Sequence, residues 1–265
     1  MNGTGYYLRL ECVRMLRDPR YLALAVIAPI GFYLLFATIF GGQPTPSGQL
    51  EGTVEIMVAM AAYGSIWGVL SATGPRISQE RSDGWVRQLR ALPLNTRQVM
   101  ASKIAAGMLV ALPALLLVCL TAVLVKGVRL DAGQWLALLP AMWLGTLPFA
   151  FLGIAIGYAV GTETAFPLSY ALYMAMSATG GLWVPPTRLP DSMRQVAETL
   201  PTYRLADLGW QIAAHRAPGW ADLAVLGAWT LGLAALAALA HRRPRLRHTV
   251  YGRTATPSGP SGDMA

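Results

Sequence analysis

Apolar residues gather along the chain into long blocks that are separated by short polar segments. The blocks lie at 21–40, 53–74, 99–125, 135–160, 165–184 and 221–240. A helix needs roughly 20 residues to cross a hydrocarbon core of about 30 Å, whereas the strands of a membrane barrel are shorter and alternate in polarity. The pattern therefore predicts an all-α membrane protein. We expect a six-helix transmembrane bundle that forms a single domain over residues 1–248, followed by a disordered tail at 249–265.

The composition supports a membrane protein, since 54% of the residues are hydrophobic and only 13% are charged. Soluble domains carry about 25% charged residues. No block has a charged residue in its middle, and Lys103 and Glu55 lie within one turn of a block end. We expect these long side chains to reach the lipid headgroups.

The basic residues are unevenly distributed between the polar segments. Most Lys and Arg residues fall before the first block, between the second and third, and after the last. Because positive charge is retained on the cytoplasmic side, this predicts that both termini and the 75–98 loop face the cytoplasm of a bacterial inner membrane. Topology thus explains the net charge of +8 without a nucleic-acid partner. Cys12 is expected in the cytoplasm and Cys119 inside a helix, so we expect no disulfide.

Three polar segments show helical periodicity of their own. Residues 5–20 predict an interfacial helix before the first span, and Pro19 ends it. In the 75–98 loop, Trp85 and Leu89 share the face of a short helix that Pro93 ends. The outer segment 185–220 predicts two amphipathic helices, either a partly re-entrant lid or helices in the membrane interface.

Small residues recur at four-residue spacing inside two spans. These are Gly64 with Gly68, and Gly153 with Gly157. In lipid such stripes let helices approach closely. They predict either packing within one bundle or the seam of a dimer.

Several kinds of chemistry are missing from the sequence. The chain has two lysines, Lys103 and Lys126, and neither forms the Gly-Lys-Ser/Thr of a phosphate-binding loop. His215, His241 and His248 form no metal-binding motif, so we expect no metal. The chain therefore cannot bind ATP through such a loop, and we expect no cofactor on it.

The loop between the second and third spans resembles the coupling segment of the type-2 ABC exporter permeases. That segment has the pattern E-x3-G-x4-L-x-A-x-P-L, and here it reads Glu80, Gly84, Leu89, Ala91, Pro93 and Leu94. The outer segment, with Val184-Pro185, Leu189-Pro190 and Leu200-Pro201-Thr202-Tyr203, resembles the family's pattern before the last span, although the usual Asn is absent. The similarity covers essentially the whole chain.

The resemblance implies a permease subunit that works as a homo- or heterodimer with separate ATP-binding cassette subunits. A coupling helix between spans two and three would dock on those subunits, and substrate would pass between the two permease halves, along spans two and five. The coupling residues it implies are Glu80, Gly84, Trp85, Leu89 and Pro93. Glu80 could instead be a solvated loop carboxylate paired with Arg76 or Arg81.

The apolar spans suit a hydrophobic or amphipathic substrate, although their Met and Trp residues can equally be ordinary packing. Two other functions stay open at this stage. A secondary transporter would use Glu55 or Glu163 for ion coupling, although we favour a helix-connecting turn for Glu163. A membrane scaffold would leave the ordered loop without a role.

Overall fold

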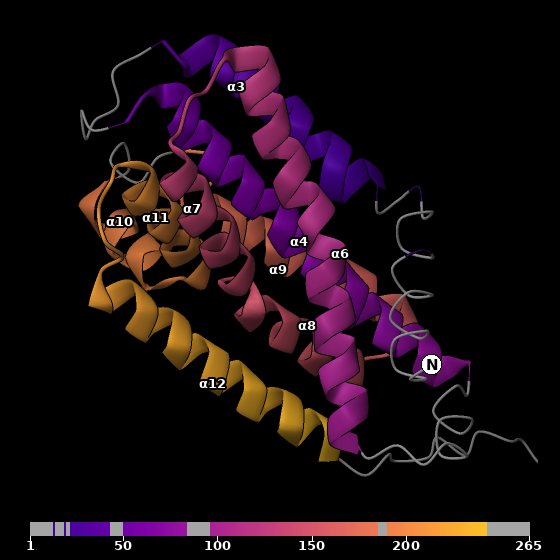
Figure 1. The fold of residues 1–265 in the computed structure, drawn as a ribbon. Coiled ribbons are helices and arrows are strands. Elements are labelled where there is room, and N and C mark those ends of the chain that lie inside the picture. The colour runs from indigo at the N-terminus through magenta and orange to yellow at the C-terminus, as the bar shows by residue number, and fades with distance from the viewer. Residues whose placement is uncertain are drawn as a thin grey trace, which may run out of the picture.

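A computed structural model describes residues 13, 19, 22–42, 50–83, 96–184 and 190–242 of the chain. Over these residues the protein is all-helical, without a β-strand (Figure 1). Of the predicted N-terminal interfacial helix only Val13 and Pro19 are described, both in helical conformation, and the coupling helix after residue 83 and the C-terminal tail fall outside the described residues.

The first span combines a π-helical turn, η1 (Leu22–Ile27), with the helix α3 (Ala28–Phe40). Pro29 follows the π-helical turn closely and is the second residue of α3. Together η1 and α3 give a helix at Ala23–Phe40, within the predicted span at 21–40, that is long and apolar enough to cross a membrane, and it packs against α4 and α6.

The helix α4 (Gly52–Ser82) is the centre of the molecule and packs against α3, α6, α8, α9 and α11. Met57, Met60 and Trp67 lie in its buried core. The helix runs well past the predicted span end at Gly74, so the prediction of a loop from Pro75 was wrong. A proline disfavours a helical conformation of the residue before it, because the two clash at that residue's Cβ. Gly74 has no Cβ, so the helix can continue through Pro75. Glu80 consequently belongs to the last turns of a helix and not to a loop.

The third span is the helix α6 (Thr96–Lys126). The predicted fourth span at 135–160 is divided into α7 (Ala132–Leu144) and α8 (Leu147–Ala159). The break falls at Gly145, whose N–H bonds back to the carbonyl of Ala141, and Pro148 opens the second helix. The two helices together are still long and apolar enough to cross a membrane.

The helix α9 (Thr162–Thr179) begins and ends earlier than the predicted fifth span at 165–184. Among the described residues, five helical segments are long and apolar enough to span a membrane, and α9 is not one of them. Its composition explains this, because Glu163, Ser169 and Ser177 lower its hydropathy. It packs against α4 and α8 nevertheless.

Two amphipathic helices precede the last span, as the sequence predicts. They are α10 (Asp191–Thr199) and α11 (Pro201–Ala213), and the span itself is α12 (Trp220–Arg242). At one end of the bundle α11 packs against α7, and α10 packs against α11 and α9, while α12 runs along α8 (Figure 1).

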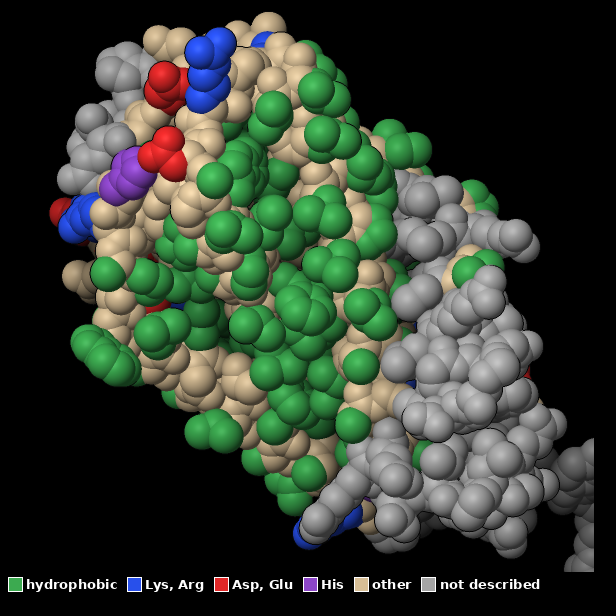
Figure 2. Space-filling view, viewed as in Figure 1, with side chains coloured by type: hydrophobic (Ala, Val, Ile, Leu, Met, Phe, Trp, Pro, Cys, Tyr) green, Lys and Arg blue, Asp and Glu red, His purple; other side chains and the backbone are tan. Residues whose placement is uncertain are grey.

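The surface carries a broad apolar face, and charged side chains lie towards its two ends (Figure 2). On α3, α6 and α12 large aliphatic side chains point outward, with Leu124 73% and Leu231 74% exposed. A water-facing surface would not carry so continuous an apolar area. The protein is therefore a multi-pass membrane protein whose apolar face contacts lipid.

Candidate coupling site

An ion pair joins the last turns of α4 to the first turns of α6. The ammonium of Lys103 donates to Oε1 of Glu80 at 2.5 Å, and Nε of Arg76 lies 3.7 Å from the same oxygen. The side chains of Lys103 and Glu80 are only 7% and 18% exposed. The prediction that Lys103 reaches the headgroups was wrong, because its charge is instead neutralised by a carboxylate on the neighbouring helix.

The same end of α4 is also bonded to α8 and α9. Arg81 donates to the carbonyl of Gly157 at 2.5 Å and lies over the ring of Tyr158. The last carbonyls of a helix lack partners within the helix, so a cation there is favourable. Ser78 donates to the carbonyl of Val160, and Thr162 at the start of α9 donates to the carbonyl of Ser78.

Glycines let α4 and α8 approach closely just above these bonds. A Cβ at Gly157 would lie 2.7 Å from the carbonyl oxygen of Gly74 and 2.8 Å from Cβ of Ile77. A Cβ at Gly153 would overlap Thr73. Both contacts involve atoms that cannot rotate away. The close spacing of α4 and α8 therefore depends on glycine, which has no side chain, at positions 153 and 157.

The other predicted glycine pair lies further along α4. A Cβ at Gly64 would lie 2.9 Å from the carbonyl oxygen of Ala25, and one at Gly68 would lie 3.0 Å from Cα of Ala111. All four glycines that the sequence singles out therefore face helices of the same chain.

Only one of the five predicted coupling residues belongs to the described part of the chain. Glu80 is at the centre of the cluster, whereas Gly84, Trp85, Leu89 and Pro93 lie outside it. The sequence did not predict Lys103 as the partner of Glu80, nor Arg81 as the bond to α8. The available signal was a carboxylate in the segment between the second and third apolar blocks and a lysine near the start of the third.

The two carboxylates considered for ion coupling lie near helix starts. Glu55 is in the first turn of α4, where its backbone carbonyl accepts a hydrogen bond from the indole of Trp210. Glu163 is exposed in the first turn of α9. Neither carboxylate lies at the middle of a span, and the described residues hold no cluster of three metal-ligating side chains.

A comparison with known families identifies the kind of protein that contains this cluster. The model of the ABC-2 type transporter family matches residues 4–208. The chain belongs to the ABC-2 type transporter family. It is also similar to YvfS of Bacillus subtilis (strain 168), described as a proposed transport permease, with 25% identity over 221 residues that cover 83% of this chain and 89% of YvfS.

Membership of this family makes the protein a membrane transport permease of an ABC transporter. Such a permease is a transport subunit that partners with an ATP-binding subunit. The cluster around Glu80 joins the last turns of α4 to α6, α8 and α9.

Proposed function

We propose that this permease is the membrane subunit of an ATP-driven exporter for a hydrophobic or amphipathic substrate. ATP-Mg binds to a separate ATP-binding cassette subunit, and a second permease subunit, identical or homologous, completes the translocation path. The family supports this assignment, as does a chain with two lysines, neither of them in a phosphate-binding loop.

The observation that carries the proposal is the set of bonds at the end of α4. A hydrolysis event outside the membrane must move helices within it, which requires a rigid connection at the cytoplasmic mouth. Glu80 connects α4 to α6, and Arg81 connects α4 to α8. A displacement of residues 84–93 by the ATP-binding subunit would then reach all these helices together. Gly84, Trp85, Leu89 and Pro93 are proposed to form the docking surface.

The proposed orientation places this end of α4, and both termini, in the cytoplasm, and the end that holds α10 and α11 outside. The uneven distribution of Lys and Arg supports it. We further propose that α9 is the sixth span. It packs against α4 and α8, so much of its less apolar surface is covered by protein and not by lipid.

The proposal is tested by purifying the protein from its native membranes in mild detergent. We expect an ATP-binding cassette protein to co-purify with the wild type and to be reduced severalfold by Trp85→Ala. Trp220→Ala is the matched control, because Trp220 is 87% exposed at the opposite end of the bundle. If no ATP-binding cassette protein co-purifies with the wild type, the exporter lacks an energy source and the proposal is contradicted.

A further inference from the structure

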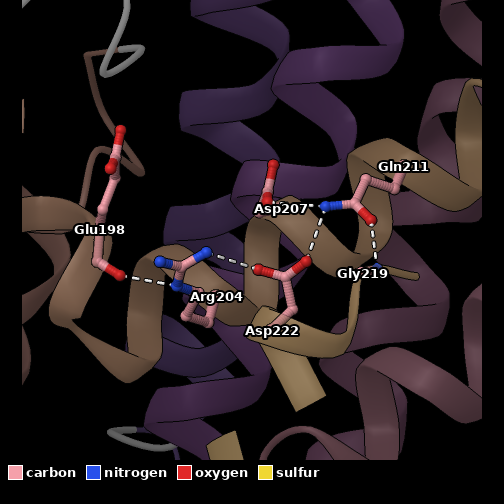
Figure 3. A network of polar contacts seen from close by, with 6 residues as sticks. All are labelled: Glu198, Arg204, Asp207, Gln211, Gly219 and Asp222. Carbon is pink, nitrogen blue, oxygen red and sulfur yellow. Dashed lines mark hydrogen bonds and ion pairs between the residues drawn. The ribbon is translucent and has the colours of Figure 1, made fainter. Parts of the chain in front are cut away.

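A polar network joins α11 to the start of α12 (Figure 3). Nη1 of Arg204 donates to Oδ1 of Asp222 at 2.8 Å, and Nε of Arg204 donates to the backbone carbonyl of Glu198 at 2.6 Å. The side chain of Asp222 is 3% exposed. A carboxylate so buried needs this cation, so Arg204 fixes the first turn of α12 against α11.

A single amide nitrogen then holds two carboxyl groups. Nε2 of Gln211 lies 2.8 Å from Oδ2 of Asp207 and 2.7 Å from Oδ2 of Asp222. The amide oxygen of Gln211 accepts from the N–H of Gly219 at 2.7 Å, which fixes the orientation of the amide. Both carboxyl groups therefore converge on the same donor, with one arginine beside them.

The charges in this network do not balance when both carboxyl groups are ionised. Burial, and then the neighbouring Asp222 carboxylate, raise the pKa of Asp207 to about 6. The hydrogen bond from Gln211 and the charge of Arg204 act in the opposite direction but do not cancel the rise. Both carboxyl groups accept from the same amide nitrogen, so ionisation of Asp207 places its negative charge beside the buried side chain of Asp222.

Further charged groups lie at the end of α11: Arg216, whose backbone N–H donates to the backbone carbonyl of Gln211, and His215, which pairs with Asp131. Glu198 and Tyr203 are the other titratable groups near Arg204, and Arg194 on α10 is occupied by Asp191 and Glu198. The helix α7 has no charged side chain, and the one charged residue of α9 is Glu163 in its first turn. From α4 the nearest carboxyl-bearing residue is Glu55, whose backbone carbonyl bonds to Trp210.

We propose that this network is a pH-dependent latch between α11 and α12, closed while the carboxyl group of Asp207 holds a proton and loosened when that proton leaves to the adjoining water. Four residues form the latch: Arg204, Asp207, Gln211 and Asp222. With the orientation proposed above, the latch senses the pH outside the cell. No bond other than that to the proton is made or broken.

The direction of the pH effect follows from the two states of Asp207. The closed latch favours the protonated form, and opening returns the carboxyl group to water, where its pKa has the ordinary value near 3.8. The stability that the proton contributes is complete below the ordinary pKa and is lost as the pH rises through about 6. Opening should therefore increase about tenfold between pH 5 and pH 7.5 and change little above that.

Opening the latch would release several contacts of α11. Thr202 donates to the carbonyl of Met176 on α9, and Trp210 donates to the carbonyl of Glu55 at the start of α4. A Cβ at Gly145 would overlap Leu205, so α11 also lies tightly against the break between α7 and α8. The latch thus keeps the outer ends of α4, α9 and α12 together in acidic medium and lets them separate near neutral pH.

Hydrogen exchange of the purified full chain in lipid nanodiscs, read by mass spectrometry, tests the latch. We compare peptides from α11 at pH 5 and pH 7.5, after correction for the pH dependence of chemical exchange, in wild type and Asp207→Asn. The asparagine resembles the protonated carboxyl group and cannot ionise. Asp191→Asn is the matched control, because Asp191 is an exposed carboxylate on α10.

We expect opening of α11 to rise about tenfold in wild type and in Asp191→Asn, with a midpoint near pH 6, and to stay low at both pH values in Asp207→Asn. Wild-type exchange without this dependence would overturn the proposal, as would Asp207→Asn with the wild-type dependence. The hydrogen-exchange measurement needs no ATP-binding subunit, whereas the exporter assignment is tested by co-purification of that subunit. Failure of the latch can therefore be distinguished from failure of the exporter assignment.

Discussion

Removing the ammonium of Lys103 should destabilise the protein because it leaves the Glu80 carboxylate poorly compensated. Breaking a buried ion pair costs about 3–5 kcal/mol, but Arg76 stays near the same oxygen and Glu80 retains some contact with solvent. We therefore expect Lys103→Met to lower the free energy of unfolding by about 2 kcal/mol. For a chain of this length that corresponds to a fall in Tm of about 4–8 °C.

The chain offers a matched control in its one other lysine. Lys126 donates to the hydroxyl of Thr38 at an exposed position, so Lys126→Met should cost less than about 1 kcal/mol. Thermal unfolding in detergent measures both variants. A double-mutant cycle with Glu80→Gln should give a coupling energy of about 2 kcal/mol between positions 80 and 103. A Tm for Lys103→Met within the error of wild type, or a cycle without coupling, would refute the role of this ion pair.

Two further predictions concern helix packing and the α11–α12 junction. Gly157→Ala should cost about 1–3 kcal/mol, because its Cβ meets the backbone of α4, while Gly232→Ala on α12 should be neutral, since it meets no atom within 4 Å. Unfolding of the two variants by heat checks this, and equal Tm values would contradict it. Arg204→Met should cost about 3–5 kcal/mol by leaving Asp222 buried without a cation, whereas Arg194→Met, in an exposed pair, should cost less than about 1 kcal/mol. If chemical denaturation shows the same loss in free energy of unfolding for Arg204→Met and Arg194→Met, burial of the Arg204–Asp222 pair does not contribute to stability.

The spans were predictable because the membrane imposes their length and apolar character. Block length alone located α3, α4, α6, α12 and the combined α7–α8 segment. The break in the fourth span was not predictable in the same way. Proline lies inside α4, α6 and α7 without ending them, so its presence beside Gly145 did not distinguish a break from a continuous helix.

The cluster around Glu80 was only partly predictable. The motif singled out Glu80, but its partner depends on the relative height and rotation of α4 and α6, which the sequence of neither helix determines alone. Glycine spacing indicated close helix contacts, but it left open whether they lie within the chain or between two copies. The structure places these four glycines at contacts within the chain.

The central claim, that ATP binding on a partner subunit moves the end of α4, is tested most directly with a spin label at position 82. Ser82 is exposed in the last turn of α4, and a label at the lipid-facing Leu124 near the far end of α6 serves as control. Both labels are introduced into a chain whose native Cys12 and Cys119 are replaced by serine. We expect ATP, added to the complex with its ATP-binding subunit, to change the mobility of the label at position 82. The mobility of the label at position 124 should stay unchanged. Spectra at position 82 that are identical with and without ATP would contradict it.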